Sequence, residues 1–326
     1  MTLYPLIFKP IFKELIWGGA DILPFKGFDK DDARKIGESW EISHVSDNFS
    51  VVANGSLEGQ TIDDLIHTFG ARLLGKKVLN QSGLIFPLLI KFIDARDNLS
   101  VQVHPNDKLA RKRHNSFGKT EMWYVVNAAP DAVLYSGFSH PVTAEEYVQR
   151  VENDTLMEVL NKYKVKTGDV FFLPAGRVHA IGAGCFIAEI QQTSDITYRI
   201  YDYNRKDAAG NTRELHTDSA VEAIDYSCYP DCQTHYTSAV NEAVLLASCK
   251  YFTTNLLDRN KPLRRNLSDL DSFVIYICTR GSALIKDNNG FEIAVNQGYT
   301  ALIPAEISEI TITPSDQAVL LETYIF

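Results

Sequence analysis

Short runs rich in valine, isoleucine, tyrosine and phenylalanine recur along the chain, and residues typical of turns separate them. Runs of this length and composition are typical of β-strands, so most of the chain is predicted to be β structure. The expected strands are 86–94, 99–103, 122–126, 170–173, 196–203, 273–278 and 299–303.

Helical patterns are fewer. Apolar residues recur at helical spacing in three segments, 61–74, 143–163 and 217–224. A threonine opens each of the first two, and acidic residues follow in the first turn. This pattern indicates a helix N-terminus, because the threonine side chain can cap free backbone N–H groups. We therefore expect three helices in a mainly β chain.

One stretch of sequence occurs twice. Residues 168–179 fit the template G-x5-P-x-G-x2-H, and residues 298–309 repeat its Gly-x5-Pro-Ala frame. The repeat predicts a tight turn, a buried strand and a proline-led turn into the next strand. Glu309 stands where the first copy has His179, and Ser272 is expected where the first copy has Glu121.

Two copies of this unit predict two small β-barrels in tandem. An uneven apolar and polar stretch near 236–242 marks the expected junction between them. The prediction is an N-terminal catalytic domain, 1–238, with helical segments, and a C-terminal domain, 239–326. Because the second copy lacks the histidine, the C-terminal barrel is expected to hold no metal.

Polar residues that could bind a metal lie at strand spacing. Gln102 and His104 are two residues apart, so on a strand they point to one face, and Lys119 and Glu121 are related in the same way. His179 begins the strand after the proline turn. Two imidazoles, a carboxylate and an amide oxygen suit Zn²⁺ and leave room for water or substrate.

A second group of polar residues suggests an anion site. Every odd position of 189–201 is polar or carries a hydroxyl, which predicts one strand with a polar face at the mouth of a cavity. Lys91 lies inside an apolar strand, and a buried unpaired lysine is costly, so it should face a polar site or a carboxylate. Lys91, Lys119 and Arg199 together would form a cationic pocket that suits a phosphoryl group.

The composition and net charge of the chain argue against some classes of function. The chain has 326 residues and a formal net charge of −9, which argues against nucleic-acid binding, since that requires an excess of lysine and arginine. Five scattered cysteines are expected to be free thiols in a reducing compartment. We find no signal-peptide core and no apolar run long enough to span a membrane, so the protein is expected to be cytoplasmic.

These motifs resemble those of the type I mannose-6-phosphate isomerases of the cupin superfamily, in their short bacterial form. They are Trp-Gly-Gly near the start, FPLLIKFIDARDNLSVQVHPND, GKTEMWYV, LPAGRVHAIGAG and SDITYRIYDYNR, in family order over most of residues 1–205. The resemblance implies two cupin (jelly-roll) barrels, of which the second is degenerate. It also implies one zinc ion per chain, held by Gln102, His104, Glu121 and His179.

The resemblance extends to the substrate site. It implies that Arg199, Lys119 and Asp195 are catalytic, and the remaining candidates for substrate binding are Lys91, Trp17 and Glu189. We expect Arg199 to act mainly on the transition state and Lys91 to act mainly on the phosphate. The partner is then a small sugar phosphate, with neither nucleic acid nor membrane.

The implied reaction interconverts mannose 6-phosphate and fructose 6-phosphate through a cis-enediol, with zinc polarising the carbonyl. The base that moves the proton is left open among Asp195, Glu189, a hydroxide held by the metal and a neutral Lys119. Two other interpretations are a sugar-phosphate-binding cupin without catalysis and an iron cupin oxygenase. Metal analysis and an isomerase assay distinguish the three.

Overall fold

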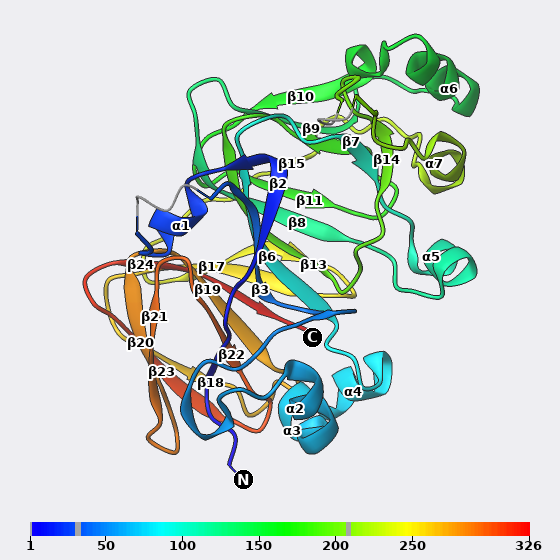
Figure 1. Cartoon of the computed structure of the whole chain (residues 1–326). Helices are drawn as coiled ribbons and strands as arrows, with labels where there is room; N and C mark the ends of the chain where they lie inside the picture. The colour runs from blue at the N-terminus through cyan, green and yellow to red at the C-terminus, as the bar shows by residue number, and fades with distance from the viewer. Residues whose placement is uncertain (1, 30–33, 207–209) are drawn as a thin grey trace.

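The computed structural model describes residues 2–29, 34–206 and 210–326, and it consists mainly of antiparallel β-sheets (Figure 1). The first barrel has two sheets. One runs in the order β15 (Gln233–Thr234), β11 (Val170–Leu173), β8 (Glu121–Ala128), β13 (Cys185–Gln192), β6 (Leu88–Ala95), β2 (Ile11–Gly19) and β3 (Ile36–Ile42), and β3 also pairs with β6. The other runs in the order β10 (Leu160–Lys164), β9 (Val133–Phe138), β12 (His179–Ile181), β7 (Val101–Val103) and β14 (Tyr198–Tyr201).

The second barrel also has two sheets. One runs in the order β1 (Leu6–Ile7), β22 (Thr300–Ile303), β19 (Val274–Arg280), β24 (Ala318–Tyr324), β17 (Thr253–Arg259) and β16 (Ala243–Ser248). The other runs in the order β18 (Leu263–Asn266), β23 (Glu309–Pro314), β20 (Ser282–Asp287) and β21 (Glu292–Asn296). A separate pair is formed by β4 (His44–Val45) and β5 (Asn48–Phe49). The predicted mainly β fold is confirmed.

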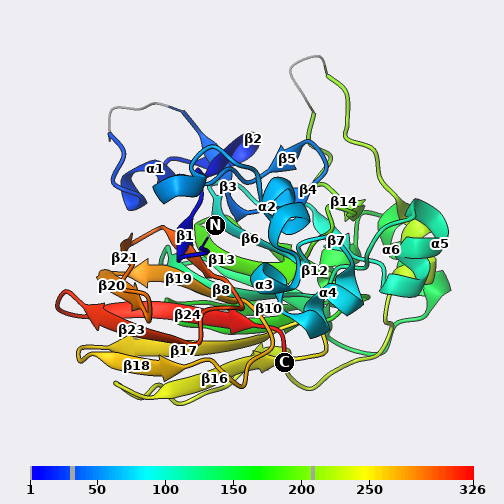
Figure 2. The ribbon, with the colours of Figure 1, turned by 90° about the horizontal axis from the view of Figure 1, so that it is seen from below.

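The helices are short and lie outside the sheets (Figures 1 and 2). They are α1 (Ile22–Phe25), α2 (Ile62–Phe69), α3 (Ala71–Leu74), α4 (Lys76–Ser82), α5 (Asp107–His114), α6 (Ala144–Glu152) and α7 (Thr217–Ala223), with two 3₁₀ turns, η1 (Gly55–Leu57) and η2 (Leu156–Val159). No described helix is long and apolar enough to cross a membrane. The predicted cytoplasmic location stays a prediction.

Two of the predicted helices are interrupted. The expected helix 61–74 breaks at Gly70, which has a φ of 50° and separates α2 from α3. The helix predicted over 143–163 ends early, at Glu152, so its second half was predicted wrongly. Asp154 adopts a positive φ of 56°, and the chain continues through η2 into strand β10. The sequence pattern also missed α5, which begins after the capping residue Asn106.

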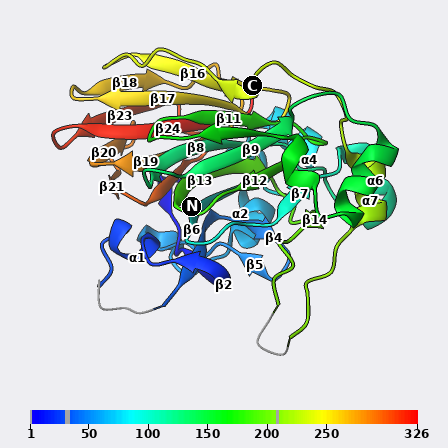
Figure 3. The same ribbon diagram turned by 90° about the horizontal axis from the view of Figure 1, so that it is seen from above.

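The two barrels pack against each other through one face of each large sheet (Figure 3). Met122 and Ile190 of the first barrel belong to the same buried cluster as Ile275 and Leu321 of the second. Strand β1 and the strands from β16 to β24 lie in the second barrel. The other described strands lie in the first barrel or in the β4–β5 pair. The domain division at 238/239 falls between β15 and β16, and we keep it as a proposal.

The repeated motif forms the same backbone structure in both barrels. Gly168 N–H donates to Val125 C=O, and Gly298 N–H donates to Cys278 C=O, each at 2.8 Å. Both glycines have a positive φ, 92° and 82°, a conformation that other residues rarely adopt. Each turn leads into a four-residue strand, β11 or β22.

Strand register corrects one alignment made from the sequence. Leu173 ends β11 and pairs with Glu121, whereas Ile303 ends β22 and pairs with Val274. Leu173 and Ile303 both precede the motif proline, so Val274 occupies the place of Glu121, and the expected Ser272 does not. The error arose because counting residues along the chain does not reveal which strand positions lie opposite each other.

Candidate metal centre

Three predicted metal ligands converge inside the first barrel. His104 follows β7, while Glu121 and His179 begin β8 and β12, so the two facing sheets both contribute. His104 Nε2 lies 3.6 Å from Glu121 Oε2, and His179 Nε2 lies 3.2 Å from Glu121 Oε1. One potential ligand atom from each side chain falls within 4.8 Å of the others, and all three residues are buried.

Backbone carbonyls orient both imidazoles. His104 Nδ1 lies 2.9 Å from Ile196 C=O, and His179 Nδ1 lies 2.8 Å from Arg177 C=O. Because a carbonyl only accepts, each Nδ1 must carry the proton, which leaves the Nε2 lone pair free to bind a cation. Burial lowers the pKa of His179 to about 3 and that of His104 well below its usual value, which keeps both rings neutral at neutral pH.

The three side chains fit a divalent metal ion. His104 Nε2, His179 Nε2 and Glu121 Oε1 are buried and have no hydrogen-bond partner in the described part of the chain. Buried polar atoms are nearly always paired, so three unpaired atoms facing one point indicate a missing ligand. Nitrogen and oxygen donors of this kind suit zinc and other first-row divalent metals.

Further polar residues lie beside His179 in the five-stranded sheet. Ser136 and Gln102 are its two cross-strand neighbours, and Arg199 lies opposite Gln102. Directly opposed residues share a face, so this row faces the same interior as His179. Arg199 donates to the Glu214 carbonyl at 3.0 Å, while its Nε has no partner among the described residues.

A charged row crosses the facing sheet. Lys91 and Trp123 are the cross-strand neighbours of Glu189, and Trp123 Nε1 donates to Glu189 Oε2 at 2.8 Å. Lys91 Nζ lies 3.4 Å from Glu189 and 3.6 Å from Glu38. Burial alone would lower the pKa of Lys91, but the two carboxylates outweigh it and raise that pKa. Lys91 therefore faces carboxylates, as the sequence predicted.

Lys119 joins this row to the metal ligands. Its Nζ lies 3.1 Å from Glu121 Oε2, and both side chains are almost fully buried. Burial raises the pKa of Glu121, and Glu189 raises it further, while Lys119 acts in the opposite direction. The ammonium group therefore partly compensates two buried carboxylates.

The segment 189–201 is not one strand, so that prediction was wrong. Glu189 lies on β13 of the seven-stranded sheet, whereas Arg199 lies on β14 of the other sheet. A tight turn separates them, in which Ser194 N–H donates to Gln192 C=O at 2.8 Å. Asp195 follows this turn, is exposed, and lines a cavity of about 320 Å³.

Trp17 is buried in the first barrel and does not lie at the rim of a cavity. It is 5% exposed and packs in the same apolar cluster as Ile93, Val125 and Phe171. Its place on β2 therefore puts the indole within the wall of the first barrel.

Sequence reasoning placed Gln191 on a polar strand face but did not foresee that it lies directly opposite Glu121. It missed Ser136, which lies opposite His179, and Trp40, which lies opposite Lys91. Their cross-strand partners depend on register, which no local pattern reveals. A serine in an apolar strand, as at Ser136, is the signal that could have prompted a search.

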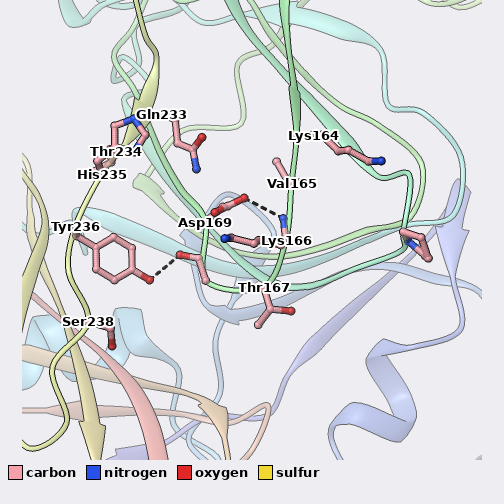
Figure 4. Close-up of a pocket in the computed structure, with 12 residues that line it drawn as sticks. Lys164, Val165, Lys166, Thr167, Asp169, Gln233, Thr234, His235, Tyr236 and Ser238 are labelled. Atoms are coloured by element: carbon pink, nitrogen blue, oxygen red, sulfur yellow. Dashed lines mark hydrogen bonds between the residues drawn. The ribbon is translucent and has the colours of Figure 1, made fainter.

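A large cavity lies elsewhere (Figure 4). It measures about 780 Å³ and lies between the stretch from Lys164, at the end of β10, to Asp169, before β11, and the segment that includes Gln233 and Tyr236. None of its lining residues is a predicted site residue. This cavity therefore does not include the candidate metal ligands.

Two barrels, with a buried His–Glu–His cluster inside the first that could hold a metal ion, define a protein of the cupin type. A family model described as phosphomannose isomerase type I, catalytic domain, matches residues 6–132. The mannose-6-phosphate isomerase ManA of Bacillus subtilis is 42% identical over 260 residues, which cover 78% of this chain and 79% of that protein. A probable mannose-6-phosphate isomerase, GmuF, of the same organism is 35% identical over 314 residues, 95% of this chain and 96% of that one.

Solved structures agree with these relatives. The crystal structure of the mannose 6-phosphate isomerase from Bacillus subtilis matches with a TM-score of 0.86 and 30% identity, covering 98% of this chain and 99% of that one. A putative mannosephosphate isomerase from Archaeoglobus fulgidus, at 22% identity and a TM-score of 0.81, shares the fold. The chain belongs to the type I phosphomannose isomerase family, and it is an enzyme of that family.

Proposed function

We propose that this chain is a zinc-dependent aldose–ketose isomerase that interconverts mannose 6-phosphate and fructose 6-phosphate through a cis-enediol. The observation that carries the proposal is the set of three buried, unpaired ligand atoms on His104, Glu121 and His179. The names of the relatives support the substrate. The second barrel contributes to packing, since its large sheet buries one face of the catalytic barrel.

The roles of the residues follow from their places. Gln102, His104, Glu121 and His179 would hold the zinc ion, whose chemistry when bound is to polarise a carbonyl and stabilise negative charge on oxygen. Lys119 and Arg199 add fixed positive charge to the same interior, where the low dielectric strengthens their attraction for an anion. The phosphate would be attracted by these cations in the same way.

The remaining candidates differ in what they can do. Burial acts to raise the pKa of Glu189, but Lys119 and Lys91 outweigh it and lower that pKa, so the carboxylate is ionised and able to accept a proton. Asp195 is exposed and lines a cavity that water can enter. We keep Asp195, Glu189 and Lys119 as candidates for the base, and Lys91 as a substrate-site residue. Trp17 packs in the apolar wall of the first barrel and would support the site from there.

An assay of fructose 6-phosphate formed from mannose 6-phosphate tests the proposal. We expect activity in the purified chain, its loss after treatment with a chelator, and its return with one equivalent of zinc. Full activity in metal-free protein would contradict the zinc requirement. No activity with zinc bound would favour a binding protein, and oxygen-dependent turnover restored by iron alone would favour an oxygenase.

A further inference from the structure

Gln191 is a buried amide beside the metal ligands with no role in the proposed function. It lies on β13, it is 0% exposed, and Glu121 is its direct cross-strand neighbour on β8. Its neighbour on the other side is the apolar Leu89. Opposed residues share a face of a sheet, so the Gln191 side chain projects from the same face as the Glu121 carboxylate.

Two backbone carbonyls fix the orientation of this amide. Gln191 Nε2 donates to Gln192 C=O at 2.8 Å and to Ser194 C=O at 2.6 Å. The nitrogen and oxygen of an amide are easily confused, but the opposite orientation would set an oxygen against two carbonyl oxygens. The two hydrogen bonds therefore use both N–H groups of the side chain and leave Oε1 pointing away from them.

Gln191 Oε1 has no partner in the described part of the chain. An unpaired buried acceptor lowers stability, because it loses its hydrogen bonds to water and gains none in return. An apolar side chain would avoid this loss at a position that served packing alone. Ser136 Oγ, beside His179, is also unpaired, but a hydroxyl can rotate, so its direction carries less information.

An oxygen that accepts hydrogen bonds determines which ligand groups can bind next to it. A sugar hydroxyl can donate a hydrogen bond, whereas a carbonyl oxygen and the oxygens of a phosphate dianion cannot. An acceptor next to Glu121 therefore favours hydroxyl-bearing carbons at the metal end of the site and disfavours the phosphate there. This preference orients an asymmetric sugar phosphate along the site.

We propose that Gln191 is a specificity-determining residue whose Oε1 accepts a hydrogen bond from one hydroxyl of the bound sugar phosphate. The inference deepens the proposed function and rests on it. Gln191→Met is the test variant, because methionine has a similar length and lacks both the acceptor and the donors. Gln149→Met, on the exposed face of α6, is the matched control.

The first measurement is kinetic. Gln191→Met is expected to lower kcat/KM for mannose 6-phosphate by roughly tenfold to a hundredfold, the scale of one lost buried hydrogen bond, with zinc content unchanged. Gln149→Met should match the unaltered chain. An unchanged kcat/KM in Gln191→Met, or loss of its zinc, would overturn the inference.

The second measurement separates substrate contact from a structural role. The probes are a linear hexitol 6-phosphate, which has hydroxyls but no carbonyl to react, and its monodeoxy forms, each used as an inhibitor. In the unaltered chain, one deoxy form should bind roughly tenfold more weakly than the parent, and in Gln191→Met that difference should disappear. If each deoxy form loses as much affinity relative to the parent in Gln191→Met as in the unaltered chain, the inference is wrong. Lack of isomerase activity in the unaltered chain would instead refute the proposed function.

Discussion

Glu189 in the first barrel and Glu322 in the second occupy equivalent strand positions. Glu189 lies opposite Trp123, and Glu322 lies opposite Tyr276. Trp123 Nε1 donates to Glu189, and Tyr276 OH donates to Glu322, each at 2.8 Å. The two interiors therefore place a carboxylate and an aromatic donor at equivalent positions.

The surroundings of the two carboxylates differ. Glu322 also accepts from Asn255 at 3.0 Å and from the Nε and Nη2 of Arg265 at 2.9 and 2.7 Å. Glu189 Oε1 has no hydrogen-bond partner among the described residues and has only an ion pair with Lys91 at 3.4 Å. The second interior has paired its central carboxylate, whereas the first keeps unpaired polar atoms that a metal and a substrate can use.

The largest effect is expected when equivalent residues in the two copies of the repeated motif are substituted. His179→Ala removes one of the two imidazoles, so we expect metal affinity to fall by more than about a hundredfold and isomerase activity to fall with it. Glu309→Ala, at the equivalent position, should change neither, because Glu309 pairs only with the exposed Arg264. Zinc content and activity of both variants are the measurements. Stoichiometric zinc in His179→Ala would contradict the assignment.

The second prediction concerns Arg199. Arg199→Ala should lower kcat by roughly a hundredfold, the scale of one preorganised charge, while zinc is retained. The substitution removes the hydrogen bond that Arg199 donates to the Glu214 carbonyl, so the folded chain should lose little stability. A raised KM with an intact kcat would show instead that Arg199 only binds phosphate.

Arg265 provides the matched control in the second barrel. Arg265→Ala leaves Glu322 buried with fewer partners and should destabilise the fold by about 2 kcal/mol, with kcat unchanged. Reduced turnover with unchanged stability would mean that the second barrel takes part in the chemistry. Denaturant unfolding and steady-state kinetics give the two values.

The third prediction concerns Lys91, which lies between two carboxylates. Lys91→Met leaves Glu38 and Glu189 without their shared cation, so we expect a loss of about 3 kcal/mol of unfolding free energy. At the same position in the second barrel, Asn255→Ala removes only a neutral partner and should cost about 1 kcal/mol. Equal losses for the two variants would mean that the first interior is no more charged than the second. If Lys91 also binds phosphate, KM should rise in the folded fraction.

The smallest effect is a pH dependence at Asp94 of the first barrel. Burial raises the pKa of Asp94 to about 6, although it accepts a hydrogen bond from Asp21 N–H at 2.7 Å. The folded state therefore holds this proton more tightly than the unfolded chain, so stability should fall as the pH rises from about 4 to about 6. Asp94→Asn should lack this slope and be more stable than the unaltered chain at pH 7. Parallel stability curves for the two proteins would contradict this account.

Local patterns were sufficient for features that depend on neighbours along the chain. The strand 170–173 agrees with β11 to the residue, and the motif glycines have the predicted turn conformation. The five cysteines are free thiols, as expected. His179 was predicted as a ligand because its motif combines a turn with a strand of fixed length, and His104 because it lies two residues from Gln102 on a strand.

Features that depend on strand pairing could not be predicted. Gln191 and Ser136 are next to ligands only through cross-strand register, and Glu38 reaches Lys91 from a neighbouring strand. The same limit explains the error at Ser272 and the single strand expected over 189–201. A period-two pattern indicates a face of a strand but not the sheet to which the strand belongs.

The most direct test of the difference between the barrels is anomalous X-ray diffraction at the zinc absorption edge from crystals of the unaltered chain. The account predicts one peak per chain, about 2.0–2.2 Å from His104 Nε2, His179 Nε2 and a Glu121 oxygen. A peak inside the second barrel near Glu322, or no peak in the first barrel of fully active protein, would contradict it.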